Sequence, residues 1–166
     1  MDSNVAIGIL AASGFLLIII LALLVITIIA NWKLFEKAGE PGWSAIVPFY
    51  SQYQMAKIAT ADARVCWTMV GVSVLNFVMS MLSNSENAVI GGIATIVSLA
   101  SLVVTCYVYF MFAKSYGQST AMCILAILFG GIIFIIMAFN KNTEYVGPKG
   151  VSNNNSYNNY NNYNSF

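Results

Sequence analysis

Residues 5–30 form an apolar run in which no residue is charged. About 20 such residues are enough for a helix to cross the hydrocarbon core of a bilayer. Three more uncharged runs follow, at residues 66–82, 88–112 and 121–139. Their length and the lack of period-two polarity exclude a membrane β-barrel, and an open sheet would leave backbone groups unpaired in lipid. We therefore expect an all-α fold, an integral membrane four-helix bundle that forms one domain over residues 1–149.

The composition fits a chain that lies in lipid, because 59% of the residues are hydrophobic and only 8% are charged. A soluble domain carries about 25% charged residues. The net charge of +1 gives no clustered basic face for phosphates, so no nucleic-acid partner is expected. The chain has no histidine, the commonest general base and metal ligand. Cys66, Cys106 and Cys123 lack metal-ligand spacing, and we expect free thiols. We therefore expect a protein that is not an enzyme, with no catalytic residue, metal or cofactor.

The lysines and arginines predict how the chain is oriented. Five lie in the connections after the first and third runs, and two lie beyond the fourth: Lys33, Lys37, Lys57, Arg64 and Lys114 against Lys141 and Lys149. By the positive-inside rule, the connections 31–65 and 113–120 are cytoplasmic. Both termini and the turn 83–87 are then extracytoplasmic, in a multi-pass protein of the cell membrane whose surroundings are membrane lipids. The first run is too long for a signal peptide core of about 7–15 residues, so we expect it to be retained.

The long connection between the first and second runs contains a segment, residues 43–60, that is apolar and aromatic but interrupted by polar side chains. Trp43, Tyr50 and Tyr53 are residue types that lie at the headgroup level, and Pro48 breaks helices. We expect a cytoplasmic interfacial helical segment that lies in the interface or dips into it. A fifth crossing is the alternative, and it would place the termini on opposite sides.

Glycines mark the expected ends of two helices. Gly39 follows a helical continuation of the first run, and Pro41-Gly42 then turns the chain. Gly117 suits a left-handed cap after the third run, and Ser119 or Thr120 can cap the next helix.

Three short motifs follow one another within residues 30–149. They are FEKAGEPGW with AIVP, Tyr50, Tyr53 and KIA behind it, then AKSYG at residues 113–117, and YVGP at residues 145–148. Together they resemble an uncharacterised prokaryotic membrane-protein family, a domain of unknown function with KAG-x-PGW-x-AI-x-P-x-Y, AKS-[FY]-G and YVGP motifs. The resemblance implies a compact helical membrane domain and no particular activity. Thr60 to Arg64 depart from the Gly and Trp that many relatives have after KIA.

Two sets of residues are candidate functional surfaces. The first is a cytoplasmic docking surface made of Trp43, Pro48, Tyr50, Tyr53, Lys57, Lys114 and Tyr116. The second is an intramembrane polar face, with members three or four residues apart along two helices: Ser73, Asn76, Ser80, Ser98, Ser101 and Thr105. Each set also has a simpler interpretation. The lysines can set topology and contact headgroups, and the polar side chains can hold helices together.

The function that we expect from these surfaces is a non-enzymatic scaffold or accessory subunit, which assembles with itself or with another membrane protein. The alternative is a small channel or transporter, whose hydroxyl- and amide-lined pathway is formed by the second and third helices of one chain or of an oligomer. Residues 150–166 are rich in Asn and Tyr, and we expect a disordered tail. Self-association of that tail is the other interpretation.

Overall fold

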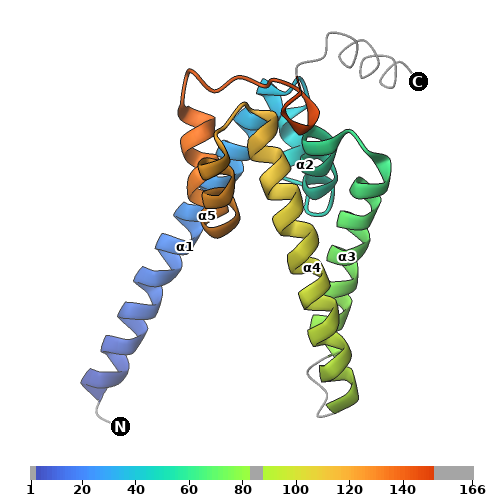
Figure 1. The fold of residues 1–166 in the computed structure, drawn as a ribbon. Coiled ribbons are helices and arrows are strands. Elements are labelled where there is room, and N and C mark those ends of the chain that lie inside the picture. Colours follow the sequence, from blue (N-terminus) through green and yellow to red (C-terminus); the bar gives the residue numbers. More distant parts are fainter. Residues whose placement is uncertain (1–2, 83–87, 152–166) are drawn as a thin grey trace.

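The computed structural model describes residues 3–82 and 88–151, with side chains for residues 13–82 and 89–151. Its elements are α1 (Ser3–Lys37), η1 (Gly42–Ala45), α2 (Tyr50–Thr60), α3 (Ala63–Leu82), α4 (Ala88–Ser115), α5 (Thr120–Phe139) and η2 (Pro148–Gly150) (Figure 1). Over these residues the fold is all-α, as predicted, and the four helices α1, α3, α4 and α5 are long and apolar enough to cross a membrane. The expected turn 83–87 and nearly all of the expected tail lie outside the described residues.

The predicted glycine caps are confirmed at the ends of α1 and α4. Gly39 has φ +79°, its N–H bonds the Glu36 carbonyl at 3.0 Å, and the Glu40 N–H bonds the Phe35 carbonyl at 2.9 Å. This pair of bonds is the Schellman motif, which favours glycine because the capping residue is left-handed. Gly117, with φ +66°, closes α4 in the same way.

The segment 43–60 forms η1 and α2, two short helical pieces joined by a bend. Phe49, just before α2, has φ +61° and contacts Phe77 of α3 at 6.1 Å between ring centroids. Phe77 lies fourteen residues into α3, which corresponds to about 21 Å along the helix. The start of α2 therefore lies deep beside α3, and α2 rises from there toward the first residue of α3. Its 11 residues span about 16 Å, which is too short to cross the bilayer.

Helix α5 is not straight. Phe129 has φ −129° and ψ 40°, which breaks the helical path near its middle. After the break, the Lys37 ammonium donates to the carbonyls of Met137 at 3.1 Å and of Asn140 at 2.8 Å. Lys37 is the last residue of α1, and only four residues separate the end of α4 from the start of α5. The two ends of α5 therefore lie at the same end of the molecule, beside the C-termini of α1 and α4.

This bend changes the predicted placement of the residues that follow α5. The sequence placed the connection 113–120 and the residues beyond Phe139 at opposite ends of the bundle. In the structure the Val146 N–H instead donates to the Ser115 carbonyl at 2.8 Å, and the Tyr145 and Tyr116 rings lie 5.6 Å apart. The apolar run 121–139, 19 residues long, had suggested a straight crossing, whereas the break at Phe129 folds the run back.

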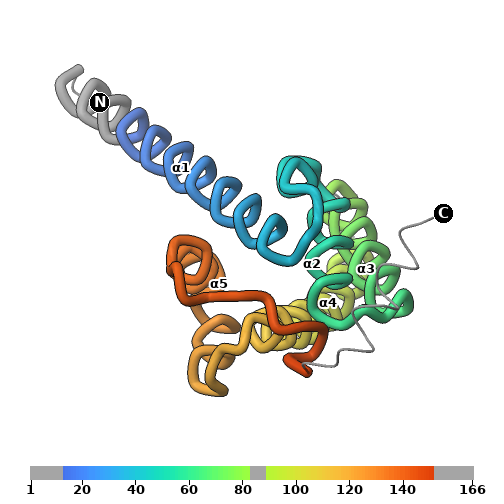
Figure 2. The backbone as a smooth tube through the Cα atoms, turned by 90° about the horizontal axis from the view of Figure 1, so that it is seen from above, coloured from blue at the N-terminus to red at the C-terminus, as the bar shows by residue number. Residues whose placement is uncertain are grey.

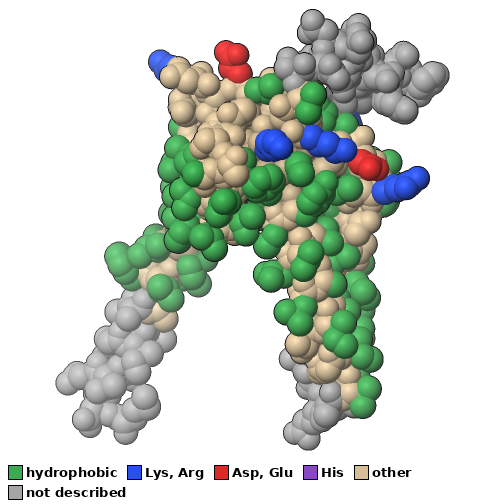
Figure 3. All heavy atoms as spheres, in the orientation of Figure 1, with side chains coloured by type: hydrophobic (Ala, Val, Ile, Leu, Met, Phe, Trp, Pro, Cys, Tyr) green, Lys and Arg blue, Asp and Glu red, His purple; other side chains and the backbone are tan. Residues whose placement is uncertain are grey.

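All seven lysines and arginines consequently gather at one end of the molecule. The basic side chains that are visible from the side drawn in Figure 3 lie at this end. We call this the charged end; it comprises the C-terminal end of α1, the C-terminal end of α2 with residues 61–65, and residues 113–120 and 140–151. Large buried aliphatic and aromatic side chains lie at or just below it, on α1, α2, α4 and α5 and in the connection after α4: Leu34, Phe35, Ile58, Val108, Phe112, Tyr116 and Met137. Away from it, every side chain of residues 13–26 on α1 is exposed.

The helices are close together at the charged end, and below it α3 and α4 remain paired while α1 separates from them (Figure 1). Helix α4 contacts α2, α3 and α5, and α1 contacts α5 and η1. Seen from above, α5 lies beside α1 and α4, away from α3 (Figure 2). The N-terminal half of α1 diverges from the α3–α4 pair (Figure 1).

Candidate functional site

The C-terminal ends of four helices converge at the charged end, and each is capped by a donor from another element. The last four carbonyls of a helix have no partner within it, so such donors stabilise the ends. At α1, Tyr116 Oη donates to Leu34 O at 2.5 Å, and at α2, Tyr145 Oη donates to Ile58 O at 3.1 Å. At α4, the Val146 N–H donates to Ser115 O. At α5, Lys37 Nζ donates to Met137 O. These contacts fix the relative positions of α1, α2, α4 and α5.

Tyr116 was predicted on the docking surface, but it lies inside the molecule. It is 2% exposed and packs against Phe112 and Tyr145 at 5.1 and 5.6 Å between ring centroids. Burial raises the pKa of Tyr116 well above its ordinary value, and Tyr145 raises it further. The hydroxyl therefore stays protonated and can donate to Leu34 at any physiological pH.

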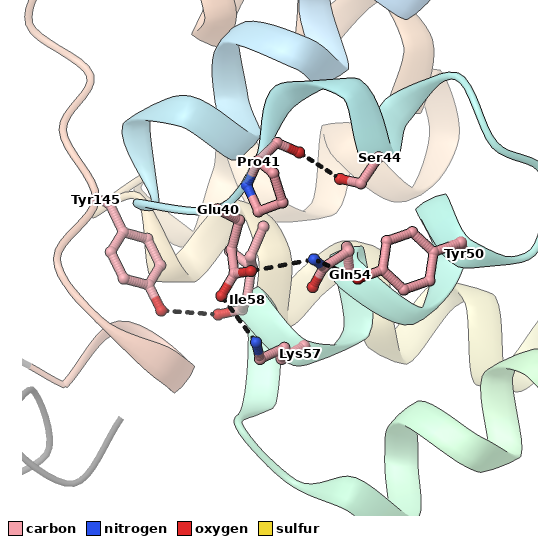
Figure 4. Close-up of polar contacts among 8 residues, drawn as sticks. All are labelled: Glu40, Pro41, Ser44, Tyr50, Gln54, Lys57, Ile58 and Tyr145. Carbon is pink, nitrogen blue, oxygen red and sulfur yellow. Dashed lines mark hydrogen bonds and ion pairs between the residues drawn. The ribbon is translucent and has the colours of Figure 1, made fainter. Parts of the chain in front are cut away.

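A buried carboxylate, Glu40, joins the connection after α1 to α2 (Figure 4). It forms an ion pair with Lys57 at 3.0 Å and accepts from Gln54 Nε2 at 3.1 Å. Gln54 is itself buried, and its amide also lies 3.4 Å from Tyr50 Oη. Lys57, predicted as part of a docking surface, is thus engaged within the molecule. Glu40 and Gln54 were not among the predicted site residues, since nothing in their spacing indicates that a turn residue meets a helix residue fourteen positions later.

The exposed part of the predicted docking surface is a row of aromatic rings. Trp43 stacks on Tyr50 with centroids 5.6 Å apart, and Tyr50 stacks on Tyr53 at 6.1 Å. Trp67 of α3, which was not among the predicted residues, extends the row by an edge contact with Tyr53 at 5.7 Å between ring centroids. Trp43 is 52% exposed and Tyr50 38%, and Pro48 is exposed as well. We call Trp43, Tyr50, Tyr53 and Trp67 the aromatic row.

Lys114 lies in another place, beside η2. The position of a Cβ on Gly150 is 2.9 Å from Lys114 Cγ, so this lysine borders the chain that returns from α5. The predicted docking set therefore divides into an exposed aromatic row, an internal ion pair, a buried tyrosine and a lysine beside η2.

Gly42 positions η1 on α1. A Cβ on Gly42 would overlap the indole of Trp32, whose Nε1 lies only 2.2 Å from the position of that Cβ. The Trp32 Nε1–H donates to Glu36 at 2.6 Å, which holds the indole in place. The glycine of the Pro41-Gly42 turn is thus required by close packing as well as by the turn.

Two members of the predicted polar face, Asn76 and Ser98, meet in the seam between α3 and α4. Ser98 Oγ lies 3.2 Å from Asn76 Oδ1, and Ser73 bonds Gln52 of α2. Ser101 and Thr105 are half-buried along α4, whereas Ser80 is exposed. The same groups also bond their own helices: Asn76 Nδ2 to Val72 O at 3.0 Å, Ser98 Oγ to Ala94 O at 2.8 Å and Ser73 Oγ to Met69 O at 2.8 Å.

Within the part of the chain that the structure describes, no group of three or more His, Cys, Asp or Glu side chains is arranged to hold a metal ion. Cys66, Cys106 and Cys123 are free thiols, and Cys66 and Cys123 are buried.

These features define a multi-pass, all-helical membrane protein with its basic residues at one end and an exposed aromatic row beside them. The chain belongs to a family of unknown function, DUF5684, which matches residues 43–148. The match extends from η1 to the start of η2 and includes the aromatic row and the α3–α4 seam. This confirms the resemblance to an uncharacterised family. No curated protein and no solved structure matches the chain.

Proposed function

We propose that this protein is a non-enzymatic scaffold or accessory subunit, which acts through helix packing and a docking surface at the charged end. The observation that supports the proposal is the exposed Trp43–Tyr50 stack on an otherwise tightly joined body. Ile46 and Val47 continue the same exposed apolar stretch, at 56% and 41% exposure. Trp and Tyr are the residue types that most often dominate binding energy at protein interfaces.

The docking surface is held in place before any partner binds. Helix α2, which carries Tyr50, is tied to the loop after α1 by the Glu40–Lys57 ion pair and to the returning chain by Tyr145. The parallel stacking of Trp43 on Tyr50 further restricts both rings. Binding to a surface of this kind requires little additional ordering, which favours affinity.

The test is purification of the full chain from native membranes in a mild detergent, followed by mass determination and identification of what elutes with it. We expect a stoichiometric membrane-protein partner or a defined homo-oligomer. Trp43→Ala should lose that assembly, whereas Phe139→Ala should keep it, because both side chains are 52% exposed and only Trp43 is in the aromatic row. A lone monomer from native membranes would refute the proposal.

A channel along the α3–α4 seam is less well supported. Ser98 faces Asn76 across the two helices and Ser73 bonds Gln52 of α2, which is the behaviour of side chains that hold helices together. Asn76, Ser98 and Ser73 each also bond a backbone carbonyl of their own helix, so these polar groups already have partners within the protein. Solute flux in liposomes that Asn76→Leu abolishes would replace the scaffold by a channel.

A further inference from the structure

We infer that α5 enters the bilayer from the charged end and returns to it, so that only α1, α3 and α4 cross the membrane. The residues after Phe139 then lie on the same side as residues 31–65 and 113–120, and the N-terminus lies on the other side. This inference is independent of the proposed scaffold function.

The order of contacts along α5 shows its direction. Gly130 packs against Tyr109, with the position of a Cβ 2.7 Å from Tyr109 Cε2. Phe134 contacts both Tyr109 and Phe112, at 5.0 and 5.2 Å between centroids. A straight α5 antiparallel to α4 would move away from Phe112 after its first turns. The second half of α5 instead approaches the C-terminus of α4 as it proceeds.

The length of each half of α5 fits a helix that reaches only partway into the bilayer. About ten residues on either side of Phe129 give about 15 Å each, half of the roughly 30 Å hydrocarbon core. Leu128, Phe129 and Ile132 near the bend are 69%, 55% and 59% exposed, so the tip is apolar and suited to lipid. Non-helical backbone at this depth must be covered by protein, and the ring of Tyr109 lies against Gly130 beside the bend.

The charges support the same topology. With α5 folded back, the charged end holds all seven lysines and arginines. If α5 crossed the membrane, Lys141 and Lys149 would lie on the other side, with five basic residues on one side of the membrane and two on the other. By the positive-inside rule, the folded-back arrangement gives the stronger orientation signal, with the charged end in the cytoplasm and the N-terminus outside.

A labelling experiment on the full chain distinguishes the two topologies. In a background with Cys66, Cys106 and Cys123 changed to Ala, single cysteines are introduced as Lys114→Cys, Glu144→Cys and Ser85→Cys, the last in the connection between α3 and α4. A membrane-impermeant maleimide is applied to intact and to permeabilised cells. We expect Glu144→Cys to behave like Lys114→Cys and react only after permeabilisation, and Ser85→Cys to react in intact cells.

Each other outcome is also decisive. If Glu144→Cys reacts from outside together with Ser85→Cys, α5 crosses and the inference is wrong. If Lys114→Cys and Glu144→Cys both react from outside, the hairpin stands and the orientation is overturned. A second experiment does not depend on the cysteine-free background. In a bacterial host, the unchanged sequence is fused after Phe166 to a fluorescent protein in one strain and to alkaline phosphatase in another. Fluorescence without phosphatase activity supports a cytoplasmic C-terminus, and phosphatase activity without fluorescence excludes it.

Discussion

Helices α3 and α5 each contain 20 residues, and each is long and apolar enough to cross a membrane. The more apolar of the two, α5, is the one that is broken and brought back to its starting end. Helix α3 carries more polar groups, Ser73 and Asn76 among them, and runs beside α4. Length and apolarity thus establish that a segment can lie in the bilayer, but they do not establish where its second end emerges.

Glycine alone does not explain the difference. Gly71 lies near the middle of α3, and nothing would contact a Cβ there within 4 Å, yet α3 has no break. Gly130 lies at the bend of α5 with the Tyr109 ring directly against it. The close contact with α4, together with the caps at the charged end, is therefore what holds α5 folded back.

The largest expected effect comes from overpacking the contact between Gly130 and Tyr109. Gly130→Val places a branched side chain where the Tyr109 ring lies, and overpacking of this kind destabilises by up to about 3 kcal/mol. Unfolding can be followed in detergent by the reaction of a thiol dye, because Cys66 and Cys123 are 2% and 1% exposed. We expect a lower midpoint of thermal unfolding in Gly130→Val.

Gly131→Val is the matched control for this prediction. It adds the same side chain at the next position, where nothing lies within 4 Å of a Cβ. Both variants lose the same glycine flexibility, so only the contact with Tyr109 distinguishes them. Equal effects of the two substitutions would show that the contact does not hold the bend.

The second prediction concerns the end of α5. Lys37→Met keeps the length of the side chain but removes the donor to Met137 O and Asn140 O. Hydrogen bonds from charged groups contribute about 1.5–3 kcal/mol, and we expect about 2 kcal/mol here because Asn140 is exposed. Lys141→Met, an exposed lysine at the same end, should change the unfolding midpoint little. A stable Lys37→Met protein would mean that α5 stays folded back without this cap.

Much of this molecule could be predicted from its sequence, and the exceptions share one cause. Helix number and the caps at Gly39 and Gly117 depend on local chemistry, which the sequence contains. The return of α5 depends on Gly130 meeting Tyr109, and the ion pair of Glu40 depends on where α2 is placed. The burial of Tyr116 likewise depends on α1 passing beside α4. These are contacts between distant segments, and residue spacing does not specify them.

The third prediction tests how α4 is tied to α1. Tyr116→Phe removes the hydroxyl that donates to Leu34 O and leaves the ring in place, with an expected loss of stability of about 1 kcal/mol.

Because the pKa of Tyr116 is raised in the folded protein, its contribution to stability also depends on pH. Below about pH 10 the tyrosine is neutral in both states. Above about pH 10, Tyr116 ionises in the unfolded chain but not in the folded protein, so the wild type loses stability as the pH rises. The Phe variant should lack this contribution, and the difference between the two proteins should shrink above pH 10; a constant difference would contradict the buried hydroxyl.

The smallest expected effect lies in the seam of α3, and it sharpens the contrast with α5. Ser98→Ala removes the hydroxyl that faces Asn76, while Asn76 keeps its bond to Val72. Hydrogen bonds between membrane helices average about 0.6 kcal/mol, and we expect a change of that size in the unfolding midpoint. Thr95→Ala is the control, since Thr95 is exposed and bonds only its own helix, at Gly91 O, among the contacts of the described residues. A loss as large as that of Gly130→Val would mean that α3 depends on a specific polar contact as strongly as α5 does. A loss near 0.6 kcal/mol would mean that α3 is held mainly by apolar packing along α4. The polar contacts between α3 and α4 would then add only a small stabilisation to a pair of helices that pack along their length.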